Sequence, residues 1–331
     1  MRKLFILFTF IIILFSITYS TLYSWGFFAH KRINRMAVFT LPPEMIGFYK
    51  KHIEFISEHA VDADKRRYSV KGEAEKHFID IDHYSKSGEN LFEVIPKRWK
   101  DAVAKYTEDS LKEHGIVPWH IDVMVKRLTE AFRQEKLNDI LKSSADLGHY
   151  VGDAHVPLHT TQNYNGQLTN QKGIHGFWES RIPELKADNY DYFVGRAQYI
   201  EDPLEKAWAI VKTSFAAKDS VLLFEAKLNV TFPTDKKYSY EHKGATLVKV
   251  YSVEYSDAYD KMLNGMVERQ LCEAVVTVGS LWYTAWVNAG QPDLTRLENK
   301  EVMEQMKKQS VEEEKTWKTG KAKDHKGHEG E

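Results

Sequence analysis

Residues 147–180 read LGHYVGDAHVPLHTTQNYNGQLTNQKGIHGFWES and hold four histidines and two acids. His149 and Asp153 are four residues apart, and so are His175 and Glu179. Residues with that spacing share one face of a helix, so each pair offers an imidazole nitrogen and a carboxylate oxygen to one point. Zinc accepts both kinds of ligand. The stretch therefore predicts helices that carry metal ligands.

A single pair of this kind is ordinary on an exposed helix, where it is only a surface ion pair. Two pairs so close together, with His159 between them, favour a metal site. Pro157 is expected to end the first helix, so that the chain can turn before His159. His155 lies two positions after Asp153, on another face, and is interpreted as a structural histidine.

The composition is typical of a globular chain with a substantial core, since 43% of the 331 residues are hydrophobic. The formal net charge of −1 excludes a basic surface spread over the whole molecule, although a local basic patch stays open. Cys272 is the single cysteine, which excludes an intramolecular disulfide. It lies in an apolar stretch and is expected to be buried.

The first 24 residues have the pattern of a secretory signal peptide. MRKLFILFTFIIILFSITYS combines a basic start with an apolar run that is short for a membrane span, and small and polar residues follow it up to Ser24. The alternative is a retained membrane anchor. We expect an exported protein, periplasmic or extracellular, in which cleavage leaves Trp25 as the first residue.

Most of the chain from residue 25 to 296 has helical periodicity, which predicts one all-α domain. Pro42 and Pro43 are expected to separate two helices. Residues 245–253 are the best strand candidate, and residues 297–331 form a charged tail that is expected to be disordered. The predicted helices cover residues 30–41, 44–60, 119–136, 137–154, 202–218 and 256–288.

Further candidate ligands lie upstream, and none is specific alone. Their positions are Trp25, His30, Asp62, Asp64, His77, Asp80, Asp82 and His83. A free amine at Trp25, together with the carbonyl of the same residue, would form a five-membered chelate with a metal. The cleavage of the signal peptide would therefore serve the metal site directly.

Taken in order, the segments WGFFAH, AVDADK, HFID, LGHYVGDAHVPLH and HGFWES resemble the zinc-dependent phospholipase C and S1/P1 nuclease superfamily. The matching series runs from residue 25 to residue 180. The resemblance implies a mostly helical fold with three zinc ions in a cleft.

Carried over to this sequence, the resemblance assigns three zinc sites. The first would be held by Asp62, His77, His149 and Asp153; the second by Trp25 and His30, with Asp153 bridging; the third by His159, His175 and Glu179. Asp62 is preferred to Asp64 because Lys65 follows it by three residues and His77 by fifteen.

The implied reaction is hydrolysis of a phosphodiester by a zinc-activated water. Asp62 would orient the water, Asp153 would bridge the zinc pair, and Lys65 would hold a phosphate oxygen. Such a reaction needs no obligate protein partner.

Two substrates are compatible with this chemistry. Glu179 resembles the phospholipase C branch, which implies a phospholipid headgroup and transient contact with a membrane surface. The step from Trp25 to His30 and the "PLH" that contains His159 resemble the nuclease branch, which implies single-stranded nucleic acid. Phe78 follows a ligand and could stack on a base, but a phenylalanine beside a metal site is more often part of the packing. Phospholipase C is the first expectation and the nuclease is the alternative. A secreted metal-binding module without activity is the third.

Overall fold

The computed structural model describes residues 26–67, 69–84, 90–243 and 246–297, together with Lys308 and Val311. The predicted signal peptide and Trp25 lie outside the described residues. The predicted tail does so too, apart from Lys308, Val311 and its first residue, Leu297, which packs into the core.

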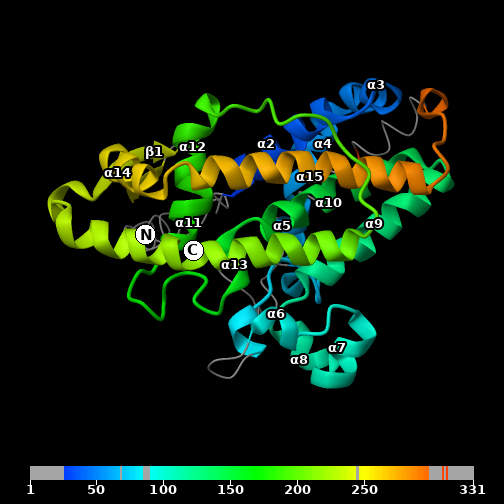
Figure 1. The fold of residues 1–331 in the computed structure, drawn as a ribbon. Helices are drawn as coiled ribbons and strands as arrows, with labels where there is room; N and C mark the ends of the chain where they lie inside the picture. Colours follow the sequence, from blue (N-terminus) through cyan, green and yellow to red (C-terminus); the bar gives the residue numbers. More distant parts are fainter. Residues whose placement is uncertain are drawn as a thin grey trace, which may run out of the picture.

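The described residues form an all-α structure with one short hairpin, which confirms the predicted fold class (Figure 1). The helices are α2 (Phe27–Ala37), α3 (Pro43–Lys51), α4 (Ile53–Glu58), α5 (Asp62–Arg67), α6 (Leu91–Val94), α7 (Trp99–Tyr106), α8 (Glu108–Glu113), α9 (Val117–Arg133), α10 (Leu137–Ala154), α11 (Ile174–Gly176), α12 (Ile182–Lys186), α13 (Pro203–Thr231), α14 (Val253–Leu263) and α15 (Met266–Asn288). The strands are β1 (Tyr238–Lys243) and β2 (Thr246–Tyr251).

The predicted break at Pro42 and Pro43 is confirmed, whereas the helix predicted over 44–60 is divided at His52 into α3 and α4. Pro43 is the first residue of α3, after an extended Pro42. The predicted helix over 256–288 is two helices, α14 and α15, because Asn264 and Gly265 adopt positive φ angles of 51° and 73°. The left-handed conformation of these two residues ends α14 and redirects the chain into α15.

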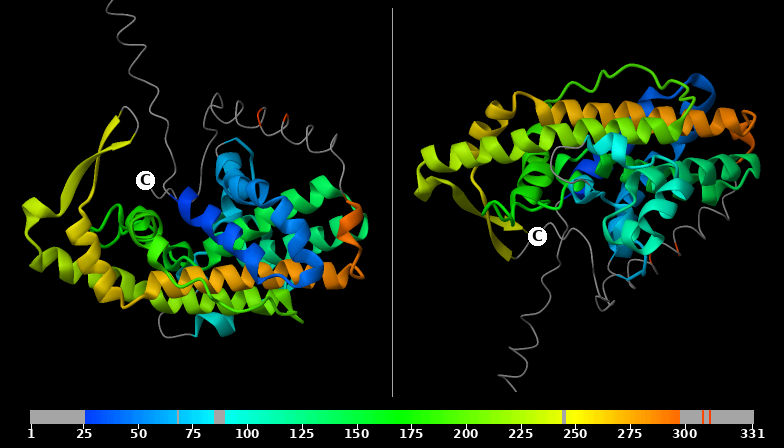
Figure 2. Two further views of the ribbon diagram at one scale, coloured as in Figure 1. Left: turned by 90° about the horizontal axis from the view of Figure 1, so that it is seen from above. Right: turned by 60° about the horizontal axis from the view of Figure 1, so that its bottom comes forward.

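The strand predicted at 245–253 is confirmed as β2, and it pairs antiparallel with β1. Strand β1 was not predicted. Its sequence, YSYEHK, is polar and lacks a run of apolar β-formers. Figure 2 shows the two strands as yellow arrows that project from the helical body.

Helix α10 lies at the centre of the packing and contacts α9, α13 and α15, and α9 in turn contacts α13 and α15. On the other side of α10, helix α2 contacts α10, α4 and α15. The long helices α13 and α15 run along the length of the molecule (Figure 1). In the core between α3, α10 and α15, the ring of Trp282 stacks on Tyr49 at 4.8 Å, and the indole N–H donates to the carbonyl of Ser144.

A close contact between α2 and α10 places their polar faces together. The amide of Asn34 donates to the carbonyls of Ile56 and Ala145, at 3.2 and 3.1 Å. A Cβ at Gly148 would lie 1.8 Å from Oδ1 of Asn34, so only glycine allows this approach. The contact holds α2 against α10 at the residue directly before His149.

Two smaller findings complete the fold. Cys272 is half-buried, with its thiol 3.4 Å from the carbonyl of Asp191, so the prediction of a fully buried cysteine was wrong. Within the described residues, no helix combines the length and apolar character that a membrane span needs.

Candidate metal centre

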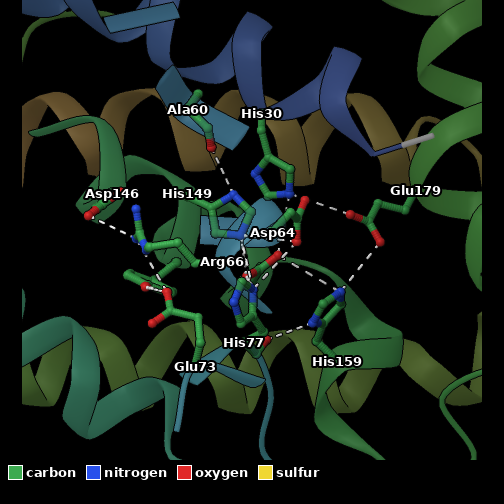
Figure 3. A network of polar contacts seen from close by, with 12 residues as sticks. His30, Ala60, Asp64, Arg66, Glu73, His77, Asp146, His149, His159 and Glu179 are labelled. Atoms are coloured by element: carbon green, nitrogen blue, oxygen red, sulfur yellow. Dashed lines mark hydrogen bonds and ion pairs between the residues drawn. The ribbon is translucent and has the colours of Figure 1, made fainter. Parts of the chain in front are cut away.

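Histidines and carboxylates from five separate elements converge at one buried site (Figure 3). Helix α2 supplies one histidine, α5 an aspartate, the chain before residues 81–84 a histidine, α10 a histidine and an aspartate, and the segment 157–181 the remaining three groups. They are His30, Asp64, His77, His149, Asp153, His159, His175 and Glu179.

The first cluster gathers around Oδ2 of Asp153. This oxygen lies 2.9 Å from Nδ1 of His77 and 3.1 Å from Nε2 of His149. The two ring nitrogens are only 3.0 Å apart, and Oδ1 of Asp64 lies 3.7 and 3.5 Å from them. Nitrogen and oxygen donors that converge in this way can hold a metal ion.

Backbone carbonyls orient two of these rings. Nδ1–H of His149 donates to the carbonyl of Ala60 at 2.8 Å, and Nδ1–H of His159 donates to the carbonyl of His77 at 2.6 Å. Because a carbonyl only accepts, the proton of each neutral ring sits on Nδ1 and the lone pair of Nε2 points into the site. Histidines that bind metals are commonly oriented in this way.

The second cluster consists of His159, His175 and Glu179, which precede α12 in the chain. Oε2 of Glu179 is 2.6 Å from Nε2 of His175 and 3.4 Å from Nε2 of His159, and the two histidine nitrogens are 3.1 Å apart. Residues 177–181 form a π-helical turn. Such wide turns occur mostly at functional sites, and this one carries Glu179.

His30 joins the two clusters. Its Nε2 lies 3.3 Å from Oδ1 of Asp153 and 3.5 Å from Oε1 of Glu179. Its ring also stacks on His149 at 4.0 Å, an approach that depends on Gly152, since a Cβ there would lie 2.9 Å from Nδ1 of His30. The two oxygens of Asp153 therefore face different groups of donors.

The charges of the site fit a cation. Burial raises the pKa values of Asp153 and Glu179, but the surrounding histidines outweigh burial and hold both pKa values well below their ordinary range. Both side chains are therefore carboxylates at neutral pH. A buried group of carboxylates needs compensating positive charge, which protonated histidines or a bound metal ion can supply.

Asp62, which the sequence analysis assigns to the first zinc site, lies outside the cluster. Its carboxylate accepts hydrogen bonds from His59 and, at 3.0 Å, from Lys65. Asp64, two residues further on, lies beside His77 and His149 instead, so of the two aspartates it is Asp64 whose carboxylate faces the cluster. Residues two apart on a helix point in directions about 200° apart, and α5 presents only Asp64 to the site.

Lys65 also lies outside the cluster, because its side-chain nitrogen contacts the carboxylate of Asp62. Arg67, which was not among the predicted site residues, follows Asp64 by three residues and shares its face of α5. The pKa of His175 is lowered, mainly by burial. The positive charge of Arg67 lies close enough to His175 to lower it further. The three-residue spacing between Asp62 and Lys65 also relates Asp64 to Arg67, although His77 follows Asp64 by thirteen residues and Asp62 by fifteen.

The remaining polar candidates have other roles in the structure. His155 is buried, its Nδ1–H donates to the carbonyl of Val151, and burial lowers its pKa to about 4, so it is the neutral structural histidine that was expected. Asp82 accepts from the hydroxyl of Thr161 and the amide N–H of Gln162. Trp25 lies outside the described residues, so the structure does not place the expected N-terminal chelate.

A buried ion-pair network supports the first cluster from behind (Figure 3). The guanidinium of Arg66 on α5 lies 3.0 Å from the carboxylate of Asp146 on α10 and 3.3 Å from that of Glu73. Glu73 also accepts from Lys76 at 2.6 Å and from the hydroxyl of Tyr150. One arginine thus links the helix of Asp64 to the helix of His149 and to the segment before His77.

Comparisons with known proteins agree with this geometry. A search of curated proteins finds no match. The family model for S1/P1 nucleases matches residues 25–282, which include every element of the site. The match covers most of the chain, and the family hydrolyses phosphodiesters. The chain therefore belongs to the S1/P1 nuclease family of phosphodiester hydrolases.

Proposed function

We propose that the protein is an exported, zinc-dependent phosphodiester hydrolase of the phospholipase C type with three zinc sites. One observation carries the proposal: the two oxygens of Asp153 face two different donor groups inside one buried cluster. A carboxylate in that position can bridge two metal ions. The family match supports the phosphodiester as substrate.

The donor set fits zinc, because imidazole nitrogens and carboxylate oxygens are its usual ligands in catalytic sites. We assign Asp64 in place of Asp62, and otherwise keep the ligands that the resemblance implies. The first ion would be held by Asp64, His77, His149 and Asp153; the second by Trp25, His30 and Asp153; the third by His159, His175 and Glu179.

Zinc, when bound, supplies Lewis acidity and brings the deprotonation of water near neutral pH. The protein's own groups would orient the ligands and the attacking water, and would neutralise the charge of the phosphodiester. Asp64 and Asp153 would hold the metal through their carboxylates, and Asp64 would take over from Asp62 the orientation of the attacking water, while the carbonyls of Ala60 and His77 hold their histidines in one tautomer. Arg67, rather than Lys65, would bind the non-bridging oxygens of the phosphodiester.

Two observations favour a phospholipid headgroup as the substrate. The last ligand of the third site is Glu179, as in the phospholipase C branch that the sequence resembles. Phe78, the residue that would stack on a base in the nuclease interpretation, is buried, with 1% of its surface exposed. A buried ring packs against the core and offers no face to a nucleotide.

Single-stranded nucleic acid is the second candidate, because the family model that matches the chain is that of nucleases. An assay of one zinc-loaded preparation on phosphatidylcholine vesicles and on single-stranded DNA separates the two substrates. We expect release of phosphocholine at a rate well above that of DNA cleavage. Cleavage of DNA without any release of phosphocholine would contradict the phospholipase C assignment and support the nuclease.

The two aspartates of α5 give a matched pair of variants. Asp64→Asn is expected to lower the zinc content and reduce hydrolysis of a soluble phosphodiester by about a hundredfold, because a direct ligand matters at least as much as the groups behind it. Asp62→Asn makes the same change two residues away and is expected to cost less than about tenfold. Metal analysis and kinetics on both variants check this, and the reverse order would restore Asp62 as the ligand.

A further inference from the structure

The β1–β2 hairpin has two faces of different character. Directly opposed residues in an antiparallel pair point to the same side of the sheet, so the register sorts the side chains. Ser239, Glu241, Val248 and Val250 share one face. The other face, which we call the aromatic face, comprises Tyr238, Tyr240, His242, Leu247, Lys249 and Tyr251.

The first of these faces holds the hairpin to the body. Arg181 donates to both carboxylate oxygens of Glu241 and, through Nε at 3.0 Å, to the carbonyl of Tyr251. Val250 is buried. The acidic side chain of this face is therefore paired, and the hairpin has a fixed attachment beside the π-helical turn that carries Glu179.

The aromatic face is exposed toward the tip. Tyr240 has 67% of its surface exposed and Leu247 has 55%. Lys249 lies on the same face, with its ammonium 3.8 Å from the ring centroid of Tyr238, and His242 is exposed beside Leu247. The face thus combines large apolar side chains with basic groups, and it carries no acid among its described side chains.

The base of the aromatic face reaches the candidate metal centre. Tyr251 stacks on Phe177 at 3.9 Å, and Phe177 lies in the chain between His175 and Glu179. The base of the hairpin therefore packs against the segment that carries the third group of ligands. A surface that contacts the tip of the hairpin is therefore held at a fixed position relative to the segment with His175 and Glu179.

We propose that the aromatic face docks on the surface of a phospholipid bilayer that contains anionic lipids, and that it presents headgroups to the metal centre. The proposal rests on the phospholipase C function proposed above. Tyrosine is favoured at the headgroup level, leucine gains by entering the acyl boundary, and lysine is attracted to anionic headgroups. Leu247 has no advantage in stacking on bases, and the ring of Tyr238 is already covered by Lys249.

The test is sedimentation with vesicles of phosphatidylcholine and phosphatidylserine, using the chain that begins at Trp25. Tyr240→Ser/Leu247→Ser is expected to weaken binding by at least about tenfold, from the apolar surface that the two side chains bury. Lys249→Gln is expected to weaken it by about fivefold, and only when phosphatidylserine is present. Phe193→Ser removes an aromatic residue outside the hairpin that is even more exposed, at 95%, and it should leave binding unchanged.

Hydrolysis of bis(p-nitrophenyl) phosphate, which needs no membrane, separates this proposal from the proposed function. The hairpin variants are expected to keep that activity and the thermal unfolding of the wild type, while losing hydrolysis of vesicles. Equal vesicle binding by the wild type and the double variant would overturn docking by the hairpin, whatever the activity. Loss of DNA binding in the double variant, without any effect on vesicles, would overturn it in favour of nucleic acid. A wild type that binds vesicles through the hairpin but hydrolyses no phosphodiester would refute the proposed function alone.

Discussion

Replacing Asp153 with asparagine is expected to abolish phosphodiester hydrolysis while leaving the fold intact. Each oxygen of Asp153 faces a different group, His77 and His149 on one side and His30 on the other. An amide has the same shape, but it carries no charge and offers a single acceptor oxygen. We expect activity to fall by more than about a hundredfold, since loss of groups that only orient ligands already costs 10- to 100-fold.

The measurement is the rate on a soluble phosphodiester, together with zinc content and circular dichroism. Asp139→Asn makes the same substitution on the exposed side of the same helix, and it should behave as the wild type. The expected zinc content of Asp153→Asn is below that of the control, because two of the assigned sites share this ligand. Full activity in a folded Asp153→Asn variant would exclude a bridging role for the carboxylate.

The second large effect is expected at Arg66, and it concerns stability. Arg66→Gln leaves the carboxylates of Asp146 and Glu73 without their shared guanidinium. Removing one partner from a buried ion pair typically costs 3–5 kcal/mol, and Arg66 is one-third exposed, so we expect a loss of about 3 kcal/mol in the free energy of unfolding. Urea unfolding of the zinc-free protein measures it, because bound metal would add to the stability of the folded state.

Arg66→Lys is the matched control, since it keeps the charge but cannot contact both carboxylates with one planar group. It is expected to recover part of the lost stability. An Arg66→Gln variant as stable as the wild type would show that the network contributes nothing to the fold.

The pH dependence of the stability of Arg66→Gln tests the charge of Glu73. Burial raises the pKa of Glu73, but Arg66, Lys76 and Tyr150 outweigh burial and lower it to about 2, against an ordinary value of 4.5. A folded-state pKa below the unfolded one stabilises the protein above pH 4.5, and that stabilisation is lost as the pH falls toward 2. The stability difference between the wild type and Arg66→Gln should therefore shrink below about pH 4.5. A difference that stays constant from pH 6 to pH 3 would assign the effect to packing alone.

The local spacing of residues was enough to predict much of the site. His149 with Asp153, and His175 with Glu179, lie four apart on single turns, and the structure brings both pairs together as predicted. The choice between Asp62 and Asp64 depends instead on how α5 is rotated against α10. The helix is only six residues long, and its sequence, DADKRR, has no apolar stripe that would reveal which side faces the core.

In the fold, too, local features were predictable from the sequence and long-range contacts were not. Helix α10 begins and ends where its periodicity and Pro157 predict. The break between α14 and α15 was missed because the apolar pattern continues through Asn264 and Gly265, and only their backbone angles reveal the turn. The hairpin was half predicted, since the attachment of β1 depends on a long-range pair between Arg181 and Glu241 that no local pattern encodes.

The central claim is a buried centre that holds three zinc ions, and counting the metal tests it most directly. The chain that begins at Trp25 should be purified without chelators, and its zinc and protein concentrations measured on the same sample. The account predicts three zinc ions per chain, with hydrolysis lost on chelation and restored by zinc. Fewer than two zinc ions per chain in an active preparation would contradict it.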